Sequence, residues 1–249
     1  MKKIKKPSKK HLSAKEIWRL VGVSLALLIW VAAAIIASEF LLGSLLSLIL
    51  GPEKFSQPVW TAVYSALSYS LALFLIIFVP WKIFKKWRTD RKELGLKGFP
   101  TWTDIGLAPV GFIVSLLIAA LLVAIFSLFP WFNAEEAQDV GFNYLSSGGD
   151  RIIAFITLVI VAPIAEEIIF RGWLYGKLRA RTNMIVSMLL VSLLFGIIHF
   201  QWNVGVNVFA MSIVLCGLRE ITGTIYSGII MHMLKNGIAF FLIYVIGMT

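Results

Sequence analysis

Residues 105–129 read IGLAPVGFIVSLLIAALLVAIFSLF and contain no charged side chain. A helix needs about 20 mostly apolar residues to cross the hydrocarbon core of a bilayer, so this stretch predicts a membrane span. The whole chain has the same character, because 59% of its 249 residues are hydrophobic and only 14% are charged. Soluble domains are about 45–50% apolar and about 25% charged. The composition therefore excludes a water-soluble fold and predicts an integral membrane protein.

Further apolar runs lie on both sides of this span. They cover residues 20–37, 59–80, 152–177, 184–200, 204–218 and 225–246. Together the runs predict an all-α, polytopic membrane bundle of seven transmembrane helices, or eight if residues 40–50 form a helix of their own. The first run is longer than the apolar part of a signal peptide, which is about 7–15 residues. We therefore expect an uncleaved anchor helix there.

The distribution of charge predicts the orientation of these helices. Most lysine and arginine residues lie in the N-terminal segment and in residues 82–97 and 171–181, whereas residues 51–57 and 131–150 contain few. Loops rich in lysine and arginine stay in the cytoplasm, so the N-terminus and both basic loops are expected there. The net charge of +10 then reflects membrane topology. It predicts a lipid bilayer and no nucleic acid as partner, and it leaves the oligomeric state open.

A few ionisable or strongly polar side chains interrupt three of the last four runs, those at residues 152–177, 184–200 and 225–246. An ionisable group inside a span costs several kcal/mol, roughly 2.5 kcal/mol or more, and so marks a functional site by default. Two of the three histidines of the chain belong to this set. The set consists of Glu166, Glu167, His199, His232, Lys235 and Asn236. Lys235 receives no role from the sequence, whereas the first three spans contain almost no such residues.

Helical spacing assigns several of these side chains to pairs. Glu167 and Arg171 are four residues apart, which favours an ion pair on one helix face. Glu166 lies about 100° further round the helix, so its carboxylate is free for another task. Phe195 lies one turn before His199 and can pack against the imidazole ring.

The same arithmetic predicts which residues lie at the same depth in the membrane. Glu166 and His199 are each about 16 residues, or roughly 24 Å, from the turn at residues 181–183. In an antiparallel hairpin they should face each other. His232 and Asn236 share one helix face, but His232 is only about 15 Å from the break at residues 219–222. It is expected nearer to the surface unless the helix tilts.

A desolvated carboxylate beside an imidazole can activate water near neutral pH. His232 and Asn236 could then stabilise the oxyanion that forms when water attacks an amide. Glu166, His199 and His232 could instead hold zinc, since catalytic zinc takes three protein ligands and a water. No HExxH motif supports zinc, so we prefer a site without a metal or other cofactor. A structural Glu167–Arg171 pair, interhelical hydrogen bonds from the histidines and a proton pathway remain alternatives.

Three short motifs in this region resemble those of the CPBP family of intramembrane proteases, which includes the type II CAAX prenyl proteases and bacteriocin-processing proteins. The residues are Glu166-Glu167-Ile-Ile-Phe-Arg171 for the EExxxR motif, Phe195-Gly-Ile-Ile-His199 for FxxxH, and His232-Met-Leu-Lys-Asn236 for HxxxN. They occur in the family's order and at similar separations. The resemblance divides the chain into residues 1–149, a basic cytoplasmic segment with three or four variable transmembrane helices, and residues 150–249, a catalytic core with about four.

The resemblance implies a membrane endopeptidase of the glutamate type, a class first described as metal-dependent. Glu166 would activate water with His199 as its partner. His232 and Asn236 would stabilise the oxyanion, and Glu167, Arg171 and Phe195 would support the site. Membrane-anchored peptides or proteins in a bacterial cell membrane are the expected substrates. The alternative is a non-proteolytic membrane protein, such as an immunity factor, a sensor scaffold or a proton-coupled transporter. The lack of polar residues in the first three spans favours the protease.

Overall fold

The computed structural model describes residues 13–247, except for residues 56, 137–141, 143–144 and 146. Within these residues the regular structure is all helical, which confirms the predicted all-α bundle. The N-terminal lysines up to Lys10, on which part of the predicted orientation depends, lie outside the described residues, as does Asp139 of the acidic loop.

The helices follow the predicted apolar runs closely. In the bounds below, η marks stretches of the wider π-helix, in which each N–H bonds five residues back. The elements are α1 (Ala14–Leu50), α2 (Pro52–Phe55), α3 (Pro58–Leu73), η1 (Phe74–Ile83), α4 (Trp102–Phe126), α5 (Gly148–Phe155), η2 (Ile156–Val161), α6 (Ala162–Glu167), η3 (Ile168–Leu174), α7 (Tyr175–Arg179), α8 (Met184–Ile197), α9 (Trp202–Thr222), α10 (Tyr226–Phe240) and η4 (Phe241–Ile246).

Consecutive helical elements join into longer rods, such as Gly148–Arg179. Within the described residues, six of these rods are long and apolar enough to cross a membrane. The fifth predicted span, residues 184–200, forms α8, whose 14 residues reach only about 21 Å. It is therefore shorter than the predicted run of residues 184–200. Residues 40–50 do not form a separate helix, because α1 continues without a break to Leu50.

Capping residues set where several helices begin. Ser13, Thr101 and Ser147 each accept a hydrogen bond from a backbone N–H three residues later, and an acidic side chain at that position bonds back to the cap. These reciprocal bonds satisfy N–H groups that a helix start leaves without partners. Asn183 caps α8 with its side chain, so the chain turns sharply between α7 and α8.

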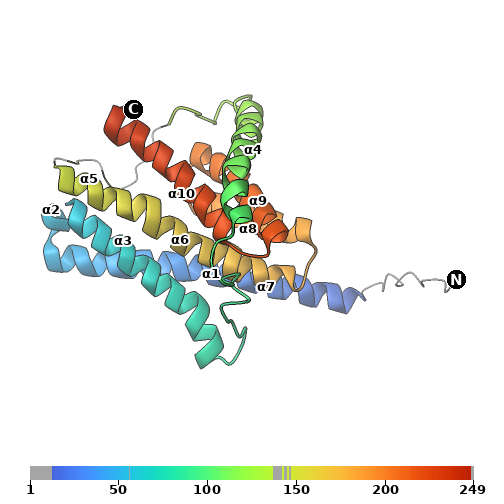
Figure 1. Ribbon diagram of the computed structural model, residues 1–249. Helices are drawn as coiled ribbons and strands as arrows, with labels where there is room; N and C mark the ends of the chain where they lie inside the picture. The colour runs from blue at the N-terminus through green and yellow to red at the C-terminus, as the bar shows by residue number, and fades with distance from the viewer. Residues whose placement is uncertain (1–12, 56, 137–141, 143–144, 146, 248–249) are drawn as a thin grey trace.

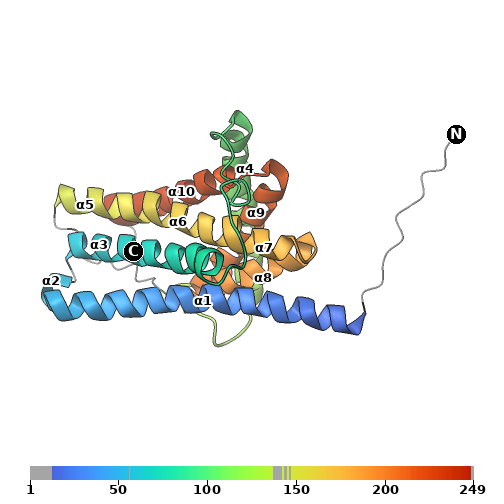
Figure 2. The same cartoon turned by 90° about the horizontal axis from the view of Figure 1, so that it is seen from below.

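Figure 1 shows α1 running beside α3, and α1 also contacts η3 and α7, while α4 packs against α9 and α10. The view in Figure 2 shows the same arrangement, with α1 extending well beyond the bundle toward the N-terminus. Helices α8 and α9 approach each other very closely. A Cβ atom added at Gly196 would lie 2.9 Å from the carbonyl oxygen of Gly205, so the two backbones touch there.

The rod from α5 to α7 is the centre of the bundle and carries the two glutamates. Its α6 segment lies between the π-helical stretches η2 and η3. Pro163 has no N–H and cannot bond to the carbonyl four residues back, and the N–H of Ala162 already reaches Thr157, five residues back. Wider turns of this kind are common at functional sites. They rotate Glu166 and Glu167 relative to the rest of the rod.

Candidate active site

Glu166 lies on α6 and is held by a residue from another helix. The hydroxyl of Tyr69, on α3, donates a hydrogen bond of 2.7 Å to Oε1 of Glu166. The second oxygen, Oε2, is 3.8 Å from Nε2 of His232, which is beyond hydrogen-bond distance. The Glu166 side chain is 19% exposed, so one carboxylate is both oriented and accessible.

Glu167, the next residue of α6, is fully buried. Its Oε1 accepts a hydrogen bond of 2.9 Å from Nη1 of Arg171, which confirms the predicted pair, and lies 3.1 Å from Nδ1 of His232. Gly228, on α10, leaves room for this carboxylate, since a Cβ there would be 3.0 Å from Oε2 of Glu167. Glu167 therefore ties α6 to α10.

His199 lies just beyond the end of α8, in the turn before α9. Its Nδ1 is 2.7 Å from the carbonyl oxygen of Phe195. A carbonyl can only accept, so Nδ1 carries the hydrogen and Nε2 is the free nitrogen of the neutral ring. The ring of Phe195 packs edge-on against the imidazole at 5.1 Å between centroids, as the spacing predicts.

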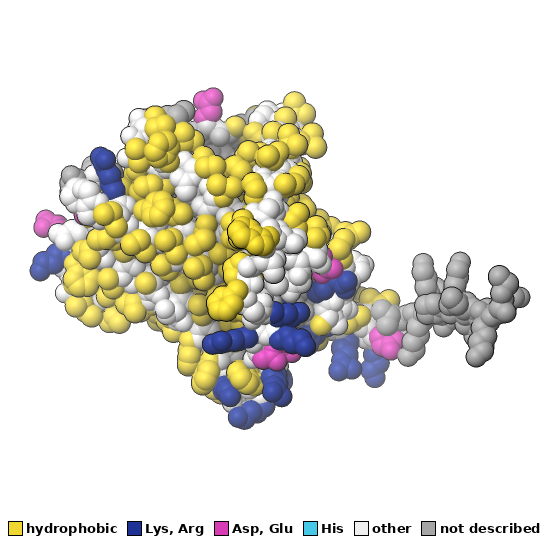
Figure 3. Space-filling view, viewed as in Figure 1, with side chains coloured by type: hydrophobic (Ala, Val, Ile, Leu, Met, Phe, Trp, Pro, Cys, Tyr) yellow, Lys and Arg dark blue, Asp and Glu magenta, His cyan; other side chains and the backbone are white. Residues whose placement is uncertain are grey.

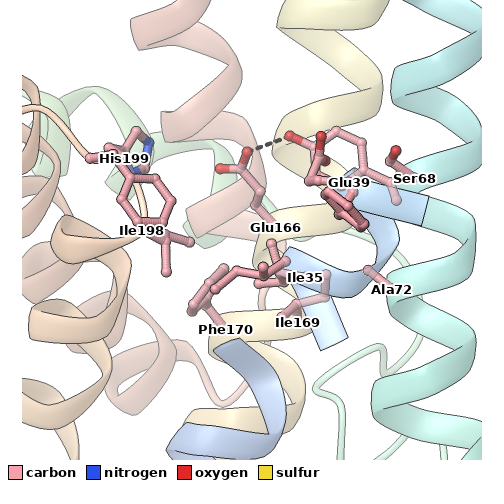
Figure 4. A pocket seen from close by; sticks show the side chains of 13 residues that line it. Ile35, Glu39, Ser68, Ala72, Glu166, Ile169, Phe170, Ile198 and His199 are labelled. Atoms are coloured by element: carbon pink, nitrogen blue, oxygen red, sulfur yellow. Dashed lines mark hydrogen bonds between the residues drawn. The ribbon is translucent and has the colours of Figure 1, made fainter. Parts of the chain in front are cut away.

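A cavity of about 490 Å³ brings Glu166 and His199 together. Figure 4 shows the Glu166 carboxylate between His199 on one side and Glu39 on the other. The remaining lining is mostly apolar. The lining residues are Ile35, Ile36, Glu39, Phe40, Ser68, Tyr69, Ala72, Glu166, Ile169, Phe170, Ile198, His199 and Phe200. The predicted Glu–His juxtaposition is thus present in the structure.

The third motif, His232 to Asn236, lies behind the wall of the cavity. His232 is buried behind Glu166, where it contacts both glutamates, although it does not line the cavity. The side-chain amide of Asn236 donates a hydrogen bond of 2.9 Å to the carbonyl oxygen of Leu158 in η2. That carbonyl belongs to one of the widened turns, so Asn236 braces the rod beside the glutamates. Lys235 lies within electrostatic range of Glu166 and His199.

The first two rods contribute polar groups to the site that the apolar sequence pattern does not indicate. The first three spans are predicted to be nearly free of polar groups, but Glu39 of α1 and Ser68 and Tyr69 of α3 all line the cavity. Tyr64 donates hydrogen bonds to the side chain and backbone carbonyl of Glu39. The signal for these residues in the sequence is their spacing, since Ser68 and Tyr69 follow Tyr64 by four and five residues.

The described residues contain no group of three histidine, cysteine, aspartate or glutamate side chains arranged to hold a metal ion. Glu166, His199 and His232 are the candidate zinc ligands, and Nδ1 of His199 and of His232 contacts Phe195 and Glu167, which leaves Nε2 of each ring available. Only His199 and Glu166 face the cavity.

Residues 148–238 match the family model of the Type II CAAX prenyl endopeptidase Rce1-like proteins. This match covers all three motifs and confirms the resemblance that they predict. It begins at α5 and ends within α10, so it contains every residue of the predicted catalytic set.

Two bacterial proteins are similar to the chain. Over 84 residues it is 34% identical to the Bacillus subtilis (strain 168) protein named "Putative membrane peptidase YdiL", and the match covers 34% of each chain. It is 26% identical over 141 residues to the UPF0177 protein YxdF of Lactococcus lactis subsp. lactis (strain IL1403), covering 53% of this chain and 70% of that protein. The chain thus matches only about a third of the length of the Bacillus relative. No solved structure matches it.

Proposed function

We propose that the chain is an intramembrane endopeptidase that cleaves membrane-associated peptides or proteins by direct attack of water. The observation that carries the proposal is the cavity in which Glu166 and His199 face each other among membrane-spanning helices. The family match and a relative named as a membrane peptidase support the same reaction class.

Glu166 is the general base of the proposed reaction. A water molecule between its carboxylate and Nε2 of His199 gives a proton to Glu166, and the water oxygen attacks the carbonyl carbon of the scissile amide. The C–N bond of the tetrahedral adduct then breaks, and Glu166 returns the proton to the leaving amine. The products are a carboxylate and an amine. Tyr69 holds the carboxylate in place throughout.

The oxyanion needs hydrogen-bond donors, and we assign this role first to His232. Its Nδ1 already donates to Glu167, so Nε2 donates only when the ring carries both protons. Asn236 uses one amide hydrogen on Leu158, which leaves the second as the other donor once substrate is bound. Glu167, Arg171 and Phe195 position His232 and His199.

The lining of the cavity favours an apolar peptide segment as substrate. Ile35, Phe40, Ile169 and Ile198 surround the two polar groups, which suits the side chains of a peptide that lies in the membrane. Both relatives are bacterial, and we therefore favour membrane-bound bacterial peptides over prenylated proteins.

The proposed topology places the N-terminus and the basic segments in the cytoplasm of a bacterial cell. It is supported by the gathering of residues 87–97, 172–181 and 219–223 around one cavity, because cationic loops are retained on the cytoplasmic side. A reporter fused after residue 91 should be active only if it functions in the cytoplasm. Periplasmic activity at this position would invert the topology.

A second candidate function is proton-coupled transport. Glu39 and its partner Tyr64, together with Tyr69 and Glu166, give the cavity carboxyl and hydroxyl groups from three helices, and such groups also form proton relays. A transporter would move a proton or solute across sealed vesicles and leave the peptide intact.

The two functions are distinguished by reconstituting the purified protein with a library of membrane-anchored peptides. We expect the wild-type protein and Glu135→Gln, a loop control, to cleave a subset of them. Glu166→Ala and His199→Ala should not. Cleavage that survives both substitutions would end the catalytic assignment.

The metal-free form of the proposal has its own test in the same assay. Cleavage should persist after treatment with a chelator. Loss of cleavage on chelation, with recovery on addition of zinc, would replace the metal-free mechanism by a zinc-dependent one.

A further inference from the structure

A second large cavity lies near the other end of the central rod. It has a volume of about 720 Å³ and is bounded by the segment of residues 87–97, by η3 and α7, and by the end of α9. Its first lining residue on the rod is Gly172, about 9 Å along the helix axis from Glu166. Phe170, which lines the first cavity, packs against Phe195 at 4.8 Å between ring centroids.

Cations dominate the lining of this basic cavity. Seven lining residues are lysine or arginine, against two glutamates. Lys177 pairs with Glu93 at 2.8 Å, and Arg179 pairs with Glu220 at 3.0 Å. Within the part of the chain that the structure describes, the other five form no ion pair with a carboxylate, although Glu220 lies within electrostatic range of Arg219. These are Arg88, Lys92, Lys97, Arg181 and Arg219.

Two of the five are fixed by backbone carbonyl groups, which orient a guanidinium without neutralising it. Arg181 donates to the carbonyl of Lys177 at 2.6 Å, and Arg219 donates to those of Glu93 and Gly223. Gly95 adopts a φ of +79°, and a Cβ there would lie 2.4 Å from Nη1 of Arg219. The turn at Gly95 is therefore shaped around this cation, which makes the cavity a built site with unneutralised charge.

The neighbourhood of the basic cavity is that of a membrane surface. Large apolar side chains flank the 87–97 segment on both sides and are exposed, with Phe84 at 55%, Phe99 at 89% and Trp102 at 87%. Aromatic side chains at the ends of spans anchor proteins at the level of lipid headgroups. Figure 3 shows lysine and arginine side chains gathered directly below a broad hydrophobic surface. Trp87 and Trp173 form an edge-to-face wall at 5.7 Å.

We propose that the basic cavity binds the phosphodiester headgroup of an anionic phospholipid. Arginine and lysine form strong, charge-assisted hydrogen bonds with phosphate oxygens, and basic pockets between transmembrane helices take such headgroups. The acyl chains would lie along the exposed apolar residues beside the cavity. The bound lipid would join the 87–97 segment to α7 and α9, at the end of the rod that carries the catalytic motif. This site is separate from the proposed peptidase reaction.

The wild-type protein alone provides the first test. Purified in a neutral detergent, it should retain phosphatidylglycerol in native mass spectrometry and be stabilised against heat by phosphatidylglycerol more than by phosphatidylcholine. Equal effects of the two lipids would overturn the proposal. Soluble glycerol phosphate should bind far more weakly, because it has no chains to bury. Binding as tight as that of the lipid would identify a site for free phosphate instead.

Matched variants locate the binding. The triple variant Arg88→Gln, Lys92→Gln, Lys97→Gln removes three cations from the cavity, whereas the control Lys85→Gln, Lys86→Gln, Arg91→Gln removes three nearby cations that do not line it. We expect the first to bind phosphatidylglycerol about 100-fold more weakly, at about fivefold for each charge. The control should lose much less. If both triple variants lost affinity for phosphatidylglycerol equally, the binding would come from the general positive charge of the surface, and the proposed site would be wrong. Displacement of the lipid by a peptide carboxylate at equal concentration would reassign the cavity to substrate.

Discussion

The two faces of α6 carry neighbouring glutamates in opposite surroundings. On the cavity face, Glu166 is partly exposed and receives its hydrogen bond from Tyr69, a residue of a different rod. On the packed face, Glu167 is buried against Arg171 and His232. The difference assigns proton transfer to Glu166 and a structural role to Glu167, because a carboxylate that must accept and return a proton cannot also be held in an ion pair. Substitutions on the two faces should therefore fail in different ways.

The largest expected effect on stability comes from the packed face. Replacing Arg171 with methionine leaves the buried carboxylate of Glu167 without its cation, and breaking such a pair costs about 3–5 kcal/mol. We expect the free energy of unfolding to fall by that amount when it is measured by denaturant titration in mixed micelles.

A second variant tests the cause of this loss. In the double variant Arg171→Met, Glu167→Gln no charge is left unpaired, and stability should recover in part. If the double variant is no more stable than Arg171→Met, the unpaired charge of Glu167 is not the cause of the lost stability, and the structural role assigned to the Glu167–Arg171 pair is wrong.

The cavity face should respond to Tyr69→Phe in activity and hardly at all in stability. The change removes only the hydroxyl that orients Glu166. The partly exposed carboxylate can bond to water instead, so folding is little affected, while the geometry needed for proton transfer is lost. We expect kcat to fall by at least about tenfold, with KM and the midpoint of thermal unfolding nearly unchanged. Tyr64→Phe, which affects Glu39 instead, is the matched control. An equal loss in both variants would contradict the positioning role of Tyr69.

The smallest predicted effect compares two glycines of α10. Alanine at Gly237 makes an ordinary contact, with its Cβ 3.6 Å from Val159, whereas at Gly228 the Cβ meets Oε2 of Glu167 at 3.0 Å. Alanine is favoured over glycine in a helix by about 1 kcal/mol. Both variants gain this propensity, so they differ by the tight contact at Gly228, and overpacking a well-packed site costs about 1–3 kcal/mol. Gly237→Ala should thus be the more stable of the two variants by at least about 1 kcal/mol, as measured by thermal unfolding. If Gly228→Ala were the more stable variant, the Glu167 side chain could accommodate the added methyl group without strain.

The sequence was sufficient to predict what depends on local spacing. Apolar runs predicted the membrane-spanning rods, and a separation of four residues predicted the Glu167–Arg171 pair and the contact of Phe195 with His199. Each of these follows from helix geometry alone. The three motifs also predicted the family resemblance that the match of residues 148–238 confirms.

Features that depend on packing between distant segments could not be predicted in this way. Tyr69 is 97 residues away from Glu166 in the chain, and no local pattern links the two. The depth calculation assumed unbroken α-helices, but the rod widens on both sides of α6, and α8 ends at Ile197, before His199. Asn236 reaches the carbonyl of Leu158, which is accessible only because η2 is a π-helix.

The central claim is that Glu166 performs the chemistry while Glu167 maintains the structure. It is tested most directly by measuring peptide cleavage and unfolding on the same preparations of Glu166→Gln and Glu167→Gln. Loss of a general base typically lowers the rate by about 10²–10⁴-fold. We predict such a loss for Glu166→Gln with its unfolding midpoint unchanged, and a clear loss of stability for Glu167→Gln. Near-normal cleavage by folded Glu166→Gln would contradict the account.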